Sequence, residues 1–169
     1  MPAGLKQTSS LIVNSSRVDE SAANTYTQGR IDLQLNPLDN EVFVVTAVDM
    51  DPAFPDSVAG ARSALSFSMT TTSQGAFPTF DSSSVIAQKI QVLDDTIPAT
   101  GVYMETGSFE APPTNLEYLA IISTNDFFLQ VQGSNQLAAK SGACKVYGYR
   151  ARADASTYAA LVQSEVLSA

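Results

Sequence analysis

The chain has 169 residues, of which 44% are hydrophobic and 15% are charged, and its formal net charge is −8. It contains no His, no Trp and one Cys, which excludes the usual proton shuttle, most transition-metal ligand sets and any internal disulfide. With only nine Lys and Arg, it also lacks the dense basic patch that direct nucleic-acid binding requires. We therefore expect a protein that builds or binds, and not an enzyme.

The length predicts a single domain with one core. Residues 1–29 are mostly polar and are predicted to form an N-terminal arm that is disordered alone or ordered by a neighbour. Its only apolar stretch is Leu11, Ile12 and Val13, which is too short for the core of a signal peptide. No run approaches the roughly 20 apolar residues of a membrane span, so no membrane span is expected.

Residues 30–169 are predicted to form the domain itself, from short runs of β-branched and aromatic residues separated by turn residues. Leu65, Phe67 and Met69 give the clearest alternation of apolar and polar positions. About eight strands are expected, at residues 30–35, 41–48, 64–70, 85–93, 102–106, 117–123, 127–132 and 144–151. This count predicts an all-β sandwich of the jelly-roll type, although a seven-stranded immunoglobulin-like sandwich fits nearly as well.

Three local patterns refine this prediction. Residues 42–45 are all apolar, which indicates cover on both faces, by the opposite sheet and by something else, such as another subunit. Pro112 and Pro113 are expected to interrupt the chain, and residues 124–126 to form a tight hairpin turn between the strands that flank them. Phe77 and Phe80, in a long polar loop, are expected to be exposed and suited to an interface.

The C-terminal residues 154–169 differ in kind from the rest of the chain. Apolar residues recur there at helical spacing, and Asp154 or Ser156 is a candidate N-cap. The predicted face of the helix comprises Ala155, Tyr158, Ala159, Val162 and Val166. We expect one short amphipathic helix packed on the rim of a sheet.

Candidate chemical sites are few. Asp49, Asp51 and Asp56 crowd one predicted loop, as carboxylates do in Ca²⁺ sites of β-sandwich loops, but Asp is also an ordinary turn residue. Asp94 and Asp95 favour a solvated turn. Paired carboxylates could serve glycoside hydrolysis, but sugar-binding sites usually use aromatic faces, and the absence of Trp argues against such an enzyme. No Ser-x-x-Lys pattern supplies a serine nucleophile with a base. No catalytic, cofactor-binding or metal-binding residue is assigned.

Other polar and reactive side chains have structural interpretations. Cys144 is expected to be a small buried hydrophobe, because no His is present to activate it. The trio Lys145, Arg150 and Arg152 is expected to carry ordinary strand-edge and helix-flank charges. Four tyrosines are candidates for a carbohydrate-binding face, with packing at the rim as the alternative: Tyr103, Tyr118, Tyr147 and Tyr149.

Two stretches, residues 16–49 and 116–169, resemble a group of small virion structural proteins encoded by marine viruses and phages. The first contains RIDLQLNPLDNEVFVVTAVD, and the second contains LEYLAIISTNDFFLQVQG and YGYRARADASTYAALVQSEVLSA. The resemblance implies a jelly-roll capsid or capsid-associated protein with no cofactor. It also implies location in the virion after synthesis in the host cytoplasm, with copies of itself and other virion proteins as partners.

The composition is consistent with such a subunit. When a surface of neutral polar and apolar residues packs against copies of itself, the cost in desolvation free energy is small, because few charges leave water. In this interpretation Leu11, Ile12 and Val13 hook an adjacent subunit by strand addition. The alternatives are a carbohydrate-recognising sandwich of a virion spike or fibre, and a monomeric sandwich with a frayed N-terminus.

Overall fold

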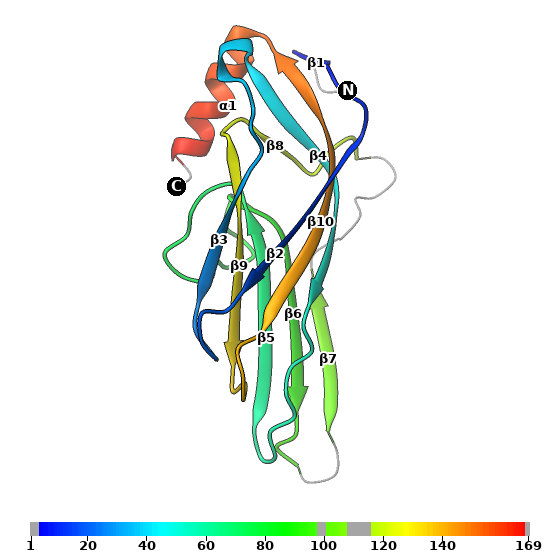
Figure 1. Ribbon diagram of the computed structural model, residues 1–169, viewed down its shortest axis with the longest axis vertical. Coiled ribbons are helices and arrows are strands. Elements are labelled where there is room, and N and C mark those ends of the chain that lie inside the picture. Colours follow the sequence, from blue (N-terminus) through cyan, green and yellow to red (C-terminus); the bar gives the residue numbers. More distant parts are fainter. Residues whose placement is uncertain (1–3, 98–100, 108–115, 168–169) are drawn as a thin grey trace.

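Strands dominate the computed structural model, which describes residues 4–97, 101–107 and 116–167 (Figure 1). One helix, α1 (Ala155–Leu167), and one short 3-10 turn, η1 (Pro37–Asp39), complete the regular structure of these residues. The strands are β1 (Leu5–Gln7), β2 (Ile12–Asp19), β3 (Thr27–Asp32), β4 (Glu41–Pro52), β5 (Arg62–Thr70), β6 (Val85–Asp94), β7 (Val102–Gly107), β8 (Ala120–Ile122), β9 (Asp126–Ser134) and β10 (Ser141–Ala153). The predicted all-β sandwich with a short C-terminal helix is confirmed. Pro112 and Pro113 lie outside the described residues.

The strands form two antiparallel sheets. In sheet A, β10 pairs with β4 on one side and with β1 and β2 on the other, and β8 pairs with the far edge of β4. Sheet B has the order β3-β9-β5-β6-β7. Figure 1 shows the strands of both sheets running along the long axis of the molecule.

The pairings between strands are nested along the chain. β5 pairs with β6, β4 with β8, β3 with β9 and β2 with β10. The strands from β2 to β5 are therefore each paired with a later strand, in reverse order, as in one long antiparallel ribbon. Most consecutive strands lie in different sheets. The predicted hairpin at residues 124–126 is wrong, because β8 lies in sheet A and β9 in sheet B.

The N-terminal segment departs most from the sequence prediction. Residues 1–29 were expected to be an arm, but β1 pairs with residues 151–153 and β2 with residues 141–148 of the same chain. Along β2, Ile12 packs against the core and Val18 is buried in it, whereas Leu11 and Val13 are exposed. This segment is thus part of the sandwich, since its backbone hydrogen bonds are made within the subunit.

The core between the sheets comes from the alternating inward positions of both. Leu65, Phe67 and Met69 of β5 are fully buried, as their alternation predicted. They meet Val45, Val48 and Met50 of β4 and Val146 of β10 in one cluster. Gly142 is required here, because a Cβ at this position would lie 2.4 Å from the ring of Phe67.

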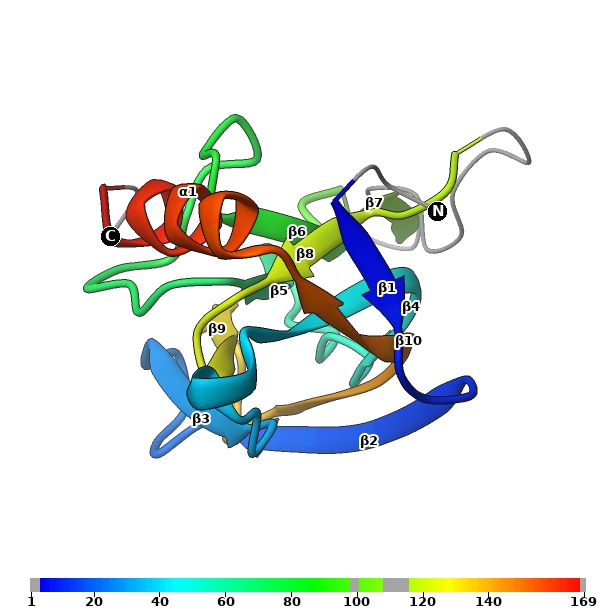
Figure 2. The ribbon, with the colours of Figure 1, turned by 90° about the horizontal axis from the view of Figure 1, so that it is seen from above.

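The run at residues 42–45 is covered on both faces, as predicted. Phe43 and Val45 belong to the core between the sheets, while Val42 and Val44 belong to a second cluster with Leu5, Ala151 and Ala153. This second cluster is covered by Tyr158 and Leu161 of α1, which Figure 2 shows lying across one end of sheet A. The cover is therefore the C-terminal helix of the same chain, and not another subunit.

The helix begins as the sequence predicts. Asp154 caps it by accepting a hydrogen bond from the backbone N–H of Thr157 at 2.7 Å. Its inward face differs from the prediction, because Ala155, Ala159 and Val166 are exposed, while Leu161 packs inward and Glu165 is buried. The Glu165 carboxylate accepts hydrogen bonds from the backbone N–H and Oγ of Ser123 and the backbone N–H of Thr124 at 2.8–3.0 Å.

The outer face of sheet B carries a row of buried polar side chains. Ser68 and Gln130 are fully buried and hydrogen-bonded at 2.8 Å, and the amide of Gln130 donates to Gln28 and Thr70. The loop of residues 71–84 covers this row, with the backbone N–H of Gln74 donating to Gln28. In that loop Phe80 is exposed, as predicted, whereas Phe77 is half-buried.

Candidate functional site

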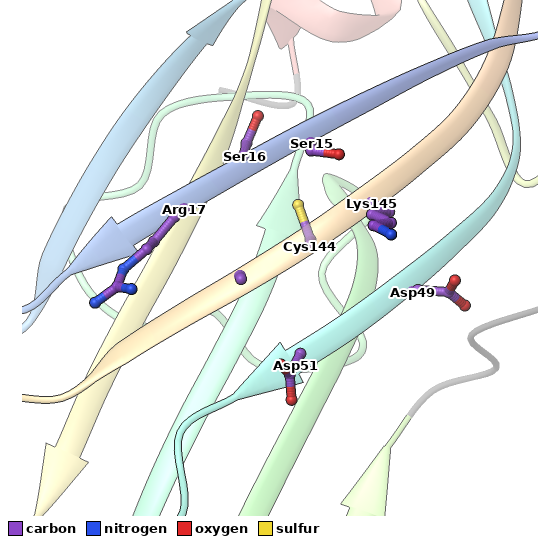
Figure 3. Close-up of a pocket in the computed structure, with 8 residues that line it drawn as sticks. Ser15, Ser16, Arg17, Asp49, Asp51, Cys144 and Lys145 are labelled. Atoms are coloured by element: carbon purple, nitrogen blue, oxygen red, sulfur yellow. The ribbon is translucent and has the colours of Figure 1, made fainter.

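A concavity of about 540 Å³ lies on the part of the outer face of sheet A that α1 leaves open. Neighbouring side chains of β2, β10 and β4 line it in two rows (Figure 3). In one row Ser15, Lys145 and Asp49 are register partners, and in the next Arg17, Ala143 and Asp51 are. Ala143 has a shorter side chain than its neighbours Arg17 and Asp51, and this difference in length creates the concavity.

Charges of both signs meet in this concavity. Lys145 stands between the β2 and β4 residues of its row, and Asp51 is exposed on β4. Arg17 is held by an ion pair with Asp19 at 2.7 Å. At the rim, the Tyr147 hydroxyl donates to Asp49 at 2.9 Å, and this hydrogen bond raises the pKa of the Tyr147 hydroxyl. The site presents hydrogen-bond donors and acceptors side by side.

The three acidic residues considered as a Ca²⁺ site do not converge. Asp49 and Asp51 lie on the outer face of β4, whereas Asp56 forms an ion pair with Lys140 at 2.6 Å. The hydrogen bond from Lys140, followed by that from the backbone N–H of Leu137, lowers the pKa of Asp56. Within residues 4–97, 101–107 and 116–167, no group of three or more Cys, Asp or Glu side chains is placed to hold a metal ion.

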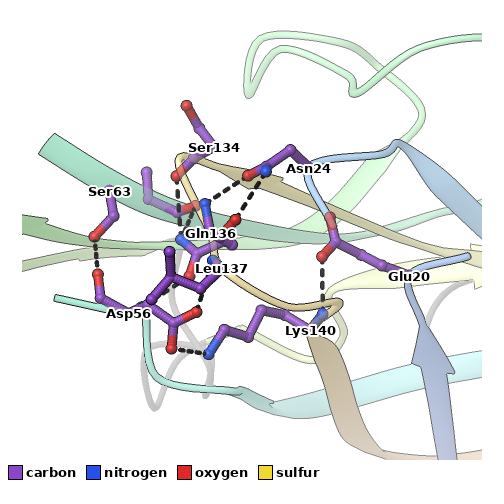
Figure 4. A network of polar contacts seen from close by, with 9 residues as sticks. Glu20, Asn24, Asp56, Ser63, Ser134, Gln136, Leu137 and Lys140 are labelled. Carbon is purple, nitrogen blue, oxygen red and sulfur yellow. Dashed lines mark hydrogen bonds and ion pairs between the residues drawn. The ribbon is translucent and has the colours of Figure 1, made fainter. Parts of the chain in front are cut away.

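Asp56 instead belongs to a network that ties together the loops at one end of the sandwich (Figure 4). Gln136 donates through its side chain to the carbonyls of Ala64 and Ser134 and accepts from the backbone N–H of Asp56. The buried Glu20 accepts from the backbone N–H groups of Gly133 and Lys140 at 2.6 and 2.8 Å. Since these groups satisfy one another, the network is structural.

The remaining predicted side chains are dispersed over the molecule. Asp94 accepts from the backbone N–H and hydroxyl of Thr96, as expected of a turn, and these bonds lower its pKa. Arg150 pairs with Glu41 at 3.0 Å and Arg152 with Asp39 at 2.6 Å, so the basic trio does not form a patch. Cys144 is buried on β10, and burial raises the pKa of its thiol to about 12.

The four tyrosines do not form one face. Tyr147 lies beside the concavity, while Tyr149 packs against the second cluster under α1. Tyr103 lies on β7 in the other sheet, where it stacks on Phe54 with ring centroids 4.8 Å apart, and Tyr118 precedes β8. The concavity was missed in the sequence, because its members come from three strands whose register the local pattern does not specify.

Comparison with known proteins gives no identity: no protein-family model matches the chain, and no curated protein is detectably similar to it. In the described part of the chain, no helix is both long and apolar enough to cross a membrane.

Proposed function

We propose that this protein is a structural subunit of a viral capsid or capsid-associated shell, built on a jelly roll and assembling with copies of itself. The observation that carries the proposal is the nested pairing of eight strands, β2 with β10, β3 with β9, β4 with β8 and β5 with β6. A ribbon of this kind, wrapped into two sheets, is the arrangement of jelly rolls, which build viral capsid and lectin domains.

Exposed apolar side chains support an assembling role. One group of them lies together, since Ile97, Val102 and Met104 line a shallow hollow on sheet B, whereas others, such as Leu38 and Leu137, are scattered singly. Apolar side chains that are exposed together favour contacts with other protein surfaces, whereas apolar side chains scattered singly are normal on a monomer. The setting in a virion is taken from the resemblance of residues 16–49 and 116–169 to virion structural proteins.

The first test is the mass of the full-length protein, measured by light scattering behind a sizing column at increasing concentrations, with negative-stain images of each peak. Growth from 17.9 kDa to closed rings or shells is expected. A strict monomer at every concentration would overturn self-assembly.

A second candidate function is carbohydrate recognition at the concavity on sheet A. The observation that favours it is the polar, mixed-charge lining by Ser15, Asp49, Asp51 and Lys145 on a fold type that also serves lectins. A ligand that binds only the folded state raises the melting temperature. A glycan that stabilises the wild type and the Asp94→Ala control, but not Asp51→Ala, would support this function. No stabilisation across a broad glycan panel would contradict it.

A further inference from the structure

Each sheet has two edges, and these four edges differ in how well they are protected against pairing with another strand. The edges formed by β2 and β3 lie beside each other, with Gly29 of β3 close to Val18 of β2. Both also carry exposed charges, Arg17 and Asp19 on β2 and Arg30 and Asp32 on β3. At the other side of sheet A, β8 is only three residues long. Short length and charge are the usual devices that prevent edge pairing.

The fourth edge, β7, has the least protection, because no charged residue lies on its outer face. Its strand Val102–Gly107 contains no Lys, Arg or Pro and has β6 as its only partner among the described strands. Val102 and Met104 are 53% and 44% exposed, and with Ile97 they line a shallow apolar hollow on the outer face of sheet B. Its one charged residue, Glu105, lies on the inner face, where it pairs with Lys89 at 2.8 Å.

We propose that β7 is a self-association edge, and that two copies of this chain pair β7 with β7 antiparallel about a two-fold axis at Met104. This inference rests on the proposed function as an assembling subunit and names the contact. Two β7 strands would extend sheet B into a sheet continuous across both copies, and Val102 and Met104 of both copies would form one apolar cluster on its outer face.

The sequence of β7 selects the register. In an antiparallel pair, residues directly opposite each other point to the same face of the sheet. A two-fold axis perpendicular to the sheet must therefore pass between a residue and the same residue of the second copy. An axis at Glu105 would set two carboxylates against each other, which is destabilising. An axis at Tyr103 would pair only residues 102–104 of the strand. An axis at Met104 pairs residues 102–106 and sets Tyr103 opposite Glu105.

The inner face of β7 is already ordered for this contact. Tyr103 is stacked on Phe54 and donates a hydrogen bond to Glu105 at 2.6 Å. Lys89 holds Glu105 from β6 and also donates to the carbonyl of Met50 at 3.3 Å. Since these side chains are fixed before pairing, the second strand meets a preformed edge and little side-chain entropy is lost.

Cysteine cross-linking tests the register directly. In the full-length protein, Met104→Cys places two thiols opposite each other, within the roughly 7 Å between Cα atoms that a disulfide allows. The matched control is Val102→Cys, whose two copies would lie about 13 Å apart in this register. The native Cys144 is 4% exposed and does not compete. We expect Met104→Cys to form disulfide-linked dimers at least about tenfold faster than Val102→Cys.

A second pair of variants tests the contribution of this edge to assembly. Met104→Lys sets two ammonium groups face to face and is expected to weaken self-association measured by light scattering, while Leu38→Lys changes an equally apolar side chain that is 93% exposed elsewhere and is expected to leave it unchanged. Circular dichroism checks that both variants fold.

The outcomes separate the two proposals. If the wild type assembles but Met104→Cys cross-links no faster than Val102→Cys, or Met104→Lys assembles normally, the β7 contact is overturned and the proposed function stands. If the wild type is monomeric at every concentration and Met104→Cys does not cross-link, both are overturned. Selective cross-linking at residue 104 together with loss of assembly in Met104→Lys supports both.

Discussion

Glu165 is a carboxylate on α1 that is 8% exposed and has three hydrogen-bond donors around it. Two of these donors are the backbone N–H groups of Ser123 and Thr124, which directly follow β8. Without this acceptor, the buried backbone N–H groups would have no hydrogen-bond partner. Hydrogen bonds of this kind fix the position of a side chain more strictly than apolar contacts do. Glu165 therefore sets where α1 lies on the sandwich.

Replacing this carboxylate tests its role. Glu165→Ala leaves the Ser123 and Thr124 N–H groups without their acceptor, which is expected to lower the free energy of unfolding by about 1–3 kcal/mol. Urea denaturation measures the change. Val166→Ala, on the exposed side of the same turn, should change it by about 0.5 kcal/mol or less. Equal effects of the two substitutions would show that Glu165 does not anchor the helix.

Asp56 predicts a pH dependence. Its pKa is lowered from 3.8 in the folded protein, chiefly by Lys140, so its contribution to stability is complete above about pH 5 and is lost as the pH falls through the folded pKa. Asp56→Asn should therefore cost about 1 kcal/mol or less at pH 7 and progressively less below pH 4. Denaturation of both proteins from pH 2 to 7 measures this. A constant difference across that range would contradict it.

At the scale of elements, the sequence predicted the strands better than their partners. Each of the eight predicted strands overlaps an observed one, because inward positions such as Leu65, Phe67 and Met69 alternate regularly, although residues 33–35 lie outside β3 and β8 is only three residues long. β2 was missed because two of its inward-pointing residues, Asn14 and Ser16, are polar and hide the alternation. The face of α1 was misjudged because a buried Glu165 counts as polar in any apolar pattern.

Pairing and site geometry could not be predicted in the same way. Register is set by the whole sheet and by turn geometry, and not by a local run. The concavity on sheet A depends on Ser15, Lys145 and Asp49, which come from three separate strands. Only their polar, outward positions within each strand are visible in the sequence.

The position of β1 leads to a prediction about the N-terminus. Leu5 is buried against Val42 and Ala153 in the cluster under α1, whereas Leu11 is exposed. Leu5→Ala is expected to destabilise the monomer by about 2 kcal/mol, and Leu11→Ala by less than about 0.5 kcal/mol. Thermal and urea unfolding of the two variants measure this. If Leu5→Ala folds as stably as wild type but no longer assembles, the segment serves a neighbour and not its own core.

At the scale of the whole molecule, the net charge of −8 opposes association of identical copies. If assembly occurs through apolar and backbone contacts, added salt screens this repulsion without weakening the contacts. Self-association measured by light scattering should therefore increase between about 0.05 and 0.5 M NaCl. Dissociation by salt would instead show that ion pairs between copies drive assembly.

The central position of β10 in sheet A has a consequence for how the protein folds. The partners of β10 are β1, β2 and β4, which precede most of the other strands, whereas β10 is the last of the described strands in chain order. During translation, β1, β2 and β4 cannot complete sheet A until β10 has left the ribosome. Folding should consequently be slow, on the order of milliseconds to seconds, and cooperative, because contacts of such high sequence separation form together or not at all.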